Sequence, residues 1–72
     1  MTRETYDCYY GRTSAVLYDE TDKKSKCYLE VKNYKGELIH SKTYDSYHAA
    51  KTVVGRIAGG EQVLVKTEHI NG

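Results

Sequence analysis

Residues 25–58 read SKCYLEVKNYKGELIHSKTYDSYHAAKTVVGRIA, and this stretch decides the fold. Its first part, residues 25–33, alternates between apolar and polar positions. Cys27, Leu29 and Val31 fall on one side of an extended chain, and the residues between them fall on the other. A period of two is typical of a strand with one buried face. We therefore predict a half-buried strand whose odd-numbered side chains face the core.

A turn and a helix follow this strand. Residues 33–36, NYKG, indicate a turn, so residues 37–44 should form the second strand of a hairpin. After Asp45 and Ser46, either of which can cap a helix, apolar residues recur at helical spacing. The spacing predicts a helix over Tyr47–Ala58, stopped by the glycines at 59 and 60. Its apolar stripe consists of Tyr47, Ala50, Val53, Val54 and Ile57, and its opposite face carries His48, Lys51, Thr52, Gly55 and Arg56.

Two more strands are expected outside this stretch. Residues 14–20 should form a strand before the polar turn at residues 21–24, and residues 62–70 should form a last strand whose first half is buried. The tyrosine-rich N-terminal segment favours one further strand, with Gly11 as a bend. The predicted fold class is α+β, in a single domain covering residues 1–72.

The predicted architecture is an antiparallel sheet of four strands, five if the N-terminal segment pairs, in the order β-β-β-α-β. One helix with one apolar stripe covers one sheet face, and the other face meets water or a partner. Because 72 residues bury a small core, dimerisation through the open face or a sheet edge is an alternative to a monomer.

Composition excludes several classes of protein. The length leaves no room for two domains around a cleft, and no apolar run approaches the 18 or so residues of a membrane span. The N-terminus lacks the charged and apolar regions of a secretion signal, so we expect a cytoplasmic protein. The net charge of +1 conceals an acidic segment, residues 1–22 at −3, and a basic segment, residues 23–56 at +5. A charged partner is therefore compatible with this chain.

The sequence carries little that is typical of catalysis or metal binding. Cys8 and Cys27 are nineteen positions apart, and the three histidines add no recognisable ligand spacing, so no metal and no cofactor is expected. Free thiols are the expected state of the cysteines, although a disulfide would be feasible if their strands were neighbours. There is no nucleophile, phosphate-loop or zinc-protease motif. We expect a non-enzymatic protein.

Binding to a protein is better supported, because all eight aromatic residues are tyrosines. Strand parity directs Tyr28 away from Leu29 and onto the open face, and a rigid amphipathic ring beside charged side chains is typical of protein interfaces. The predicted partner-binding residues are Tyr28, Lys26, Glu30, Lys32 and Lys42. A packing role for Tyr28 within a hydrated sheet face is the structural alternative.

Several families share this layout. The stretch KGELIHSKTYDSYHAAKTVVGRIA resembles the strand-to-helix junction of double-stranded-RNA-binding domains and the three-stranded arm-binding domains of phage integrases. In size and element order, the whole chain is similar to small phage-encoded inhibitors, notably ferredoxin-like anti-CRISPR proteins of the type I-F class. That resemblance implies occlusion of a larger partner, a nuclease or nucleic-acid-binding complex, in the host cytoplasm. It rests on layout alone and transfers no residue.

The competing interpretation is a small nucleic-acid-binding module. It would use basic residues of the hairpin and helix, and its binding would weaken steeply with salt because phosphate contacts release counterions. The candidate residues for this alternative are Lys23, Lys24, Lys35, Lys51 and Arg56, together with Lys26 and Lys32.

Overall fold

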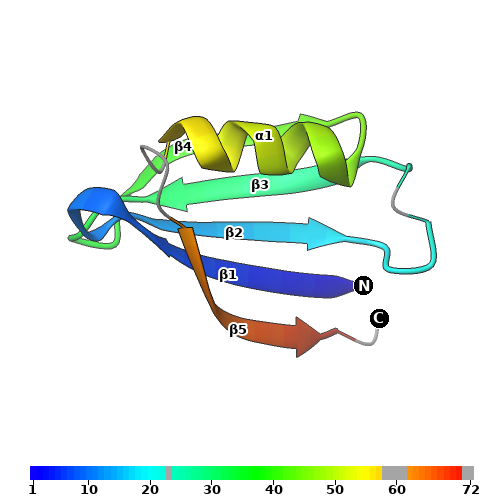
Figure 1. Ribbon diagram of the computed structural model, residues 1–72, viewed down its shortest axis with the longest axis horizontal. Coiled ribbons are helices and arrows are strands. Elements are labelled where there is room, and N and C mark those ends of the chain that lie inside the picture. Colours follow the sequence, from blue (N-terminus) through cyan, green and yellow to red (C-terminus); the bar gives the residue numbers. More distant parts are fainter. Residues whose placement is uncertain (23, 58–61, 71–72) are drawn as a thin grey trace.

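A computed structural model describes residues 1–22, 24–57 and 62–70, and it shows a five-stranded antiparallel sheet with one helix on one face (Figure 1). The prediction of an α+β fold is confirmed, and the N-terminal segment supplies the fifth strand. The elements are β1 (Thr2–Cys8), a 3-10 turn (Tyr9–Gly11), β2 (Thr13–Tyr18), β3 (Cys27–Lys32), β4 (Leu38–Tyr44), α1 (Tyr47–Ile57) and β5 (Gln62–His69).

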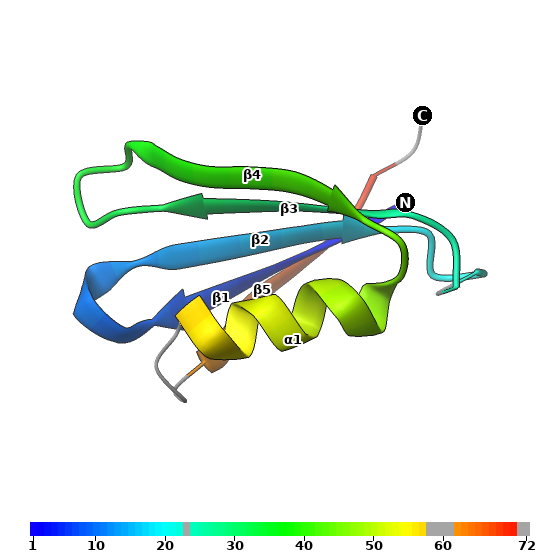
Figure 2. The ribbon, with the colours of Figure 1, turned by 90° about the horizontal axis from the view of Figure 1, so that it is seen from above.

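The sheet order is β4-β3-β2-β1-β5. The first four strands form consecutive hairpins, and the chain then crosses the sheet through α1, so that β5 pairs with β1 (Figure 2). This crossing places the first and last strands side by side, and the Ile70 amide donates to the Met1 carbonyl at 2.8 Å. Strands β4 and β5 are therefore the two edges of the sheet.

The core lies between α1 and the central strands. The odd-numbered side chains of β3 face the helix, as the alternation predicted, and Leu29 and Val31 are fully buried. The predicted helix stripe is also confirmed, because Ala50 and Val54 are buried and the other three members pack against the buried core. The buried hydrophobic residues are Tyr6, Val16, Tyr18, Cys27, Leu29, Val31, Ala50 and Val54.

Both ends of α1 have identifiable hydrogen-bond partners. The Ser46 hydroxyl accepts a bond from the Ala49 amide at 3.1 Å, so Ser46 provides the side-chain cap. The Arg12 guanidinium donates to the Ile57 carbonyl at 3.0 Å, where a cation also complements the helix dipole. The predicted last residue, Ala58, and the glycines at 59 and 60 lie outside the described residues.

The predicted burial of the first half of the last strand is wrong. Val63, Leu64 and Val65 are 62%, 49% and 51% exposed. The reason is topological: α1 packs over β2, β3 and β4, whereas β5 is an edge strand beside β1. Apolar side chains of an edge strand stay exposed when no layer covers them.

The two cysteines are free thiols. They belong to β1 and β3, which are separated by β2, so their strands are not neighbours. Burial raises the pKa of the Cys27 thiol to about 11, with a further contribution from the Glu4 charge, so this thiol is inert at neutral pH. Over the described part of the chain, no helix is long and apolar enough to cross a membrane.

Candidate functional site

The sheet face opposite α1 is the candidate site, and we call it the open face. It carries the alternate side chains that do not face the helix, and no described element lies over it (Figure 2). Its central members are Arg3 and Thr5 from β1, Thr13, Ala15 and Leu17 from β2, Tyr28, Glu30 and Lys32 from β3, and Lys66 and Glu68 from β5.

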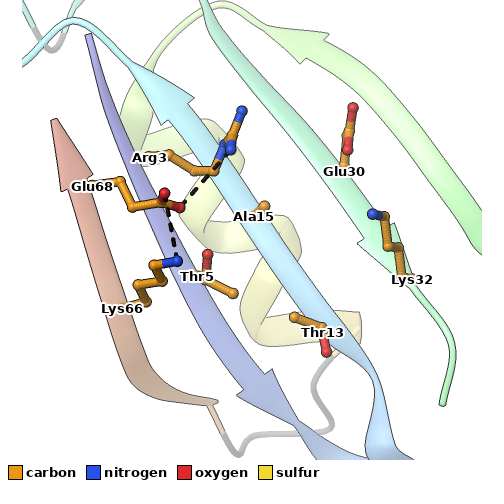
Figure 3. A pocket seen from close by; sticks show the side chains of 8 residues that line it. All are labelled: Arg3, Thr5, Thr13, Ala15, Glu30, Lys32, Lys66 and Glu68. Atoms are coloured by element: carbon orange, nitrogen blue, oxygen red, sulfur yellow. Dashed lines mark ion pairs between the residues drawn. The ribbon is translucent and has the colours of Figure 1, made fainter. Parts of the chain in front are cut away.

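A hollow of about 420 Å³ occupies the middle of the open face (Figure 3). Small side chains form its floor, because Thr5, Thr13 and Ala15 meet there on adjacent strands. Longer charged side chains stand on both sides: Arg3, Lys66 and Glu68 on one, Glu30 and Lys32 on the other (Figure 3). A partner's side chain can therefore enter between two charged rows.

Tyr28 lies beside a second, smaller hollow of about 70 Å³. Its neighbours across the strands are Leu17 in β2 and Thr43 in β4, and its side chain is half-buried against them. This hollow shares Arg3, Ala15 and Glu30 with the larger one, so the two lie next to each other. The open face thus combines an apolar and aromatic end with a charged centre.

The ion pairs of the open face are exposed. Glu68 lies 3.9 Å from the Arg3 guanidinium and 3.5 Å from the Lys66 ammonium. Exposed pairs of this kind contribute little to stability, because solvent screens them and both side chains lose freedom. They can be exchanged for pairs with a partner at little cost to the fold.

The structure brings together three of the five predicted partner-binding residues. Tyr28, Glu30 and Lys32 lie on the open face, as strand parity predicted. Lys26 is exposed but precedes the first residue of β3.

The placement of Lys42 with these residues is wrong. Lys42 stands opposite the buried Leu29, and directly opposed residues of an antiparallel pair share a face. Its ammonium lies 5.3 Å from the centroid of the Tyr44 ring, on the helix side. The adjacent apolar residues Leu38 and Ile39 obscured the register of β4, which shifts next to Lys32.

Sequence reasoning missed the larger part of the open face, which β1, β2 and β5 contribute. Arg3, Thr5 and Thr13 follow a period of two, but the pairing of β1 with both β2 and β5 carries no local signal. Alternation along a strand shows which of its side chains share a face. The pairing of the strands must also be known before these residues can be assigned to the same face of the sheet. The remaining missed residues are Ala15, Leu17, Lys66 and Glu68.

Among the described residues, those predicted for nucleic-acid binding are spread over different parts of the molecule. Lys24 lies in the turn between β2 and β3, and Lys35 lies in the turn between β3 and β4, at the opposite end of the sheet (Figure 1). Arg56 is exposed on α1, while Lys23 lies outside the described residues.

The predicted position of Lys51 on the solvent face of the helix is also wrong. Its ammonium lies 3.5 Å from the centroid of the Tyr6 ring and donates to Gln62 Oε1 at 3.2 Å. The long aliphatic stem lets this cation reach over the sheet from the side of the helix. Desolvation lowers its pKa.

On the helix side, the Glu4 carboxylate accepts hydrogen bonds from three tyrosine hydroxyls. Tyr47, Tyr6 and Tyr18 donate to it at 2.6, 2.8 and 3.1 Å. Desolvation raises the pKa of Glu4, but these three bonds and the Lys51 charge together outweigh it, and the pKa lies below its usual value. Desolvation, together with the Glu4 charge, raises the pKa of Tyr6 and of Tyr18 to about 12. This cluster joins the first residue of α1 to β1 and β2, which indicates a structural role.

A tyrosine tip, consisting of Tyr9, Tyr10 and Tyr34, lies at the end of the sheet where two turns meet. Gly11 has a φ of 71°, and a Cβ there would come within 2.8 Å of the Tyr34 Cβ, so the turns pack closely. Tyr10 is 81% exposed and Tyr34 is 72% exposed. Cations accompany both rings: Arg12 lies 5.6 Å from the Tyr10 centroid and Lys35 lies 5.7 Å from the Tyr34 centroid.

No group of three or more His, Cys, Asp or Glu side chains placed to hold a metal ion occurs in residues 1–22, 24–57 and 62–70. No protein family model, curated protein or solved structure gives a significant match to this chain.

Proposed function

We propose that this protein is a non-enzymatic binding protein whose open face docks on a larger protein partner. The observation that carries the proposal is the position of Tyr28, on the face opposite α1 and beside a hollow that charged side chains border. A few anchor residues, most often Trp, Tyr and Arg, supply most of the binding energy of an interface, and other charges mainly set orientation and association rate. The open face offers both components within one continuous surface.

The finer proposal is that docking occludes a nucleic-acid-processing protein, as in the phage-encoded inhibitors that the layout resembles. The mixed charge of the open face supports a protein partner, since two carboxylates lie among its three cations. On a surface that contacted phosphates along its whole length, only the cations would increase the affinity. Occlusion requires only tight binding, so no catalytic group is needed on this chain.

Alanine substitutions on the open face test the proposal. The protein is immobilised, proteins from its native host are passed over it, and retained partners are quantified for each variant. Tyr28→Ala should lower the affinity for the retained partner roughly thirtyfold, or by about 2 kcal/mol of binding free energy. Lys32→Ala should lower the binding free energy by about 0.5 kcal/mol. Thr52→Ala, on the exposed side of α1, is the matched control and should change nothing. Equal, small effects from Tyr28→Ala and Thr52→Ala would contradict the proposal.

Single-stranded nucleic acid is the second candidate ligand, and the tyrosine tip is the observation that favours it. Exposed rings beside cations can stack bases and contact phosphates. If this is the function, binding to a short single strand should fall steeply with salt and should be lost in Tyr10→Ala and Tyr34→Ala. No binding at low salt would remove this candidate.

A further inference from the structure

No strand among the described residues pairs with the outer edge of β5, so backbone groups at defined positions of β5 point away from the sheet. Met1 and Ile70 exchange two backbone hydrogen bonds, the Ile70 amide donating at 2.8 Å and the Met1 amine at 3.3 Å. Because such pairs alternate along an antiparallel ladder, Glu68 and Lys66 also direct their backbone groups toward β1. Thr67 and His69 therefore direct their N–H and C=O groups outward, away from the sheet.

The side chains along this edge are complementary to their own copy. Lys66 and Glu68 flank Thr67 on the same face of the sheet, and both are accessible. If two copies of β5 pair antiparallel about Thr67, each Lys66 stands directly opposite Glu68 of the second copy. The two outward-facing Thr67 residues then exchange two backbone hydrogen bonds. Backbone geometry and charge thus select the same register.

The other edge of the sheet lacks this property. Strand β4 carries His40 and Lys42 and contains no acidic residue, so no antiparallel register of two β4 strands creates an opposite-charge pair within the strand. Strand β5 has an apolar side chain at an exposed edge, because Val65 is 51% exposed. Such an edge strand is prone to aggregate unless another chain or element covers it.

We propose that the protein forms a symmetric dimer through antiparallel pairing of β5 with β5 of a second copy, centred on Thr67. The two sheets then form one continuous sheet, in which the two open faces lie side by side. The proposal does not rest on the function of the open face, although its two charged residues, Lys66 and Glu68, also border the larger hollow of that face.

Charge reversal at two positions tests the register. In Lys66→Glu, the introduced carboxylate would oppose Glu68 of the second copy, and in Glu68→Lys, the introduced ammonium would oppose Lys66 of the second copy. Either single variant should weaken dimerisation about tenfold, because two cross-strand pairs change from attraction to repulsion. An equimolar mixture of the two single variants should form a heterodimer about as tightly as the wild type forms a homodimer. Sedimentation equilibrium over a range of concentrations measures all three affinities.

A proline tests the backbone. Thr67→Pro removes an N–H that points away from β1, so the fold should persist, as circular dichroism and thermal unfolding would show, while the dimer is lost. Lys42→Glu, on the opposite edge, is the control and should leave the dimer unchanged. A wild-type protein that is monomeric at every accessible concentration would overturn the proposal. So would a dimer that Lys66→Glu and Thr67→Pro leave intact.

Discussion

The two faces of the sheet are built from the same strands but differ in the burial and the hydrogen bonding of their side chains. Leu29 is fully buried beneath α1, whereas its neighbour Tyr28 is half-buried on the open face. On the helix side, the polar Glu4 has three internal hydroxyl donors. On the open face, the charged residues pair only at the exposed surface. The difference indicates that the helix side provides most of the stability, and the proposed binding role is assigned to the open face.

The largest expected difference between the faces is in core packing. Leu29→Ala should lower the free energy of unfolding by about 2–5 kcal/mol, because it removes a fully buried side chain and leaves a cavity. Tyr28→Ala should lower it by about 1 kcal/mol or less, since most of its effect should appear in binding. Urea denaturation of both variants measures the difference. Equal losses would show that the open face also contributes to the core.

Hydrogen bonding to Glu4 gives the next largest difference. Glu4→Gln should cost about 2 kcal/mol, because a neutral amide oxygen cannot accept from three hydroxyls as well as a carboxylate does. Glu30→Gln is the matched substitution on the open face and should change stability by about 0.5 kcal/mol or less. If both variants unfold at the same urea concentration as the wild type, the tyrosine hydroxyls contribute nothing measurable through Glu4.

The same carboxylate makes stability depend on pH. The pKa of Glu4 in the folded protein lies below its usual value of 4.5, so the unfolded chain binds the proton more tightly. The stabilisation from Glu4 is complete above that usual value and is lost as the pH falls through the folded pKa. Between about pH 6 and pH 3, Glu4→Gln should therefore lose less stability than the wild type. A parallel loss in both proteins would contradict the role of Glu4.

The smallest expected effect concerns the ion pairs of the open face. Arg3→Ala removes the contact with Glu68, and both side chains are well exposed. The free energy of unfolding should change by about 0.5 kcal/mol or less. Thermal unfolding at low and high salt measures it. A loss as large as that in Glu4→Gln would mean that the open face is a stabilising surface.

The sequence alone was sufficient where the signal is local. The alternation of Cys27, Leu29 and Val31 predicted which face of β3 is buried, and it placed Tyr28 on the other face. The apolar spacing from Tyr47 to Ile57 predicted α1 and its buried stripe. In both segments, buried residues recur with the period of the strand or of the helix. The pattern within one element is therefore enough to predict its buried face.

Features that depend on long-range pairing could not be predicted. Val63, Leu64 and Val65 have the composition of a buried strand, but they lie at an edge because β5 pairs with β1. Similarly, Lys42 lies on the helix side because of the register between β3 and β4, which shifts beside Lys32. Half of the residues that line the larger hollow come from β1 and β5, whose contact joins the two ends of the sequence.

Photo-crosslinking from position 28 tests the central claim most directly. A benzophenone-bearing residue is placed at Tyr28 in one variant and at Thr52, on the exposed side of α1, in another. After irradiation in the native host, we expect the Tyr28 variant to form one predominant adduct with a larger protein and the Thr52 variant to form none. An adduct from position 52 alone, or the same adduct at equal yield from both positions, would contradict the assignment of the open face as the docking surface.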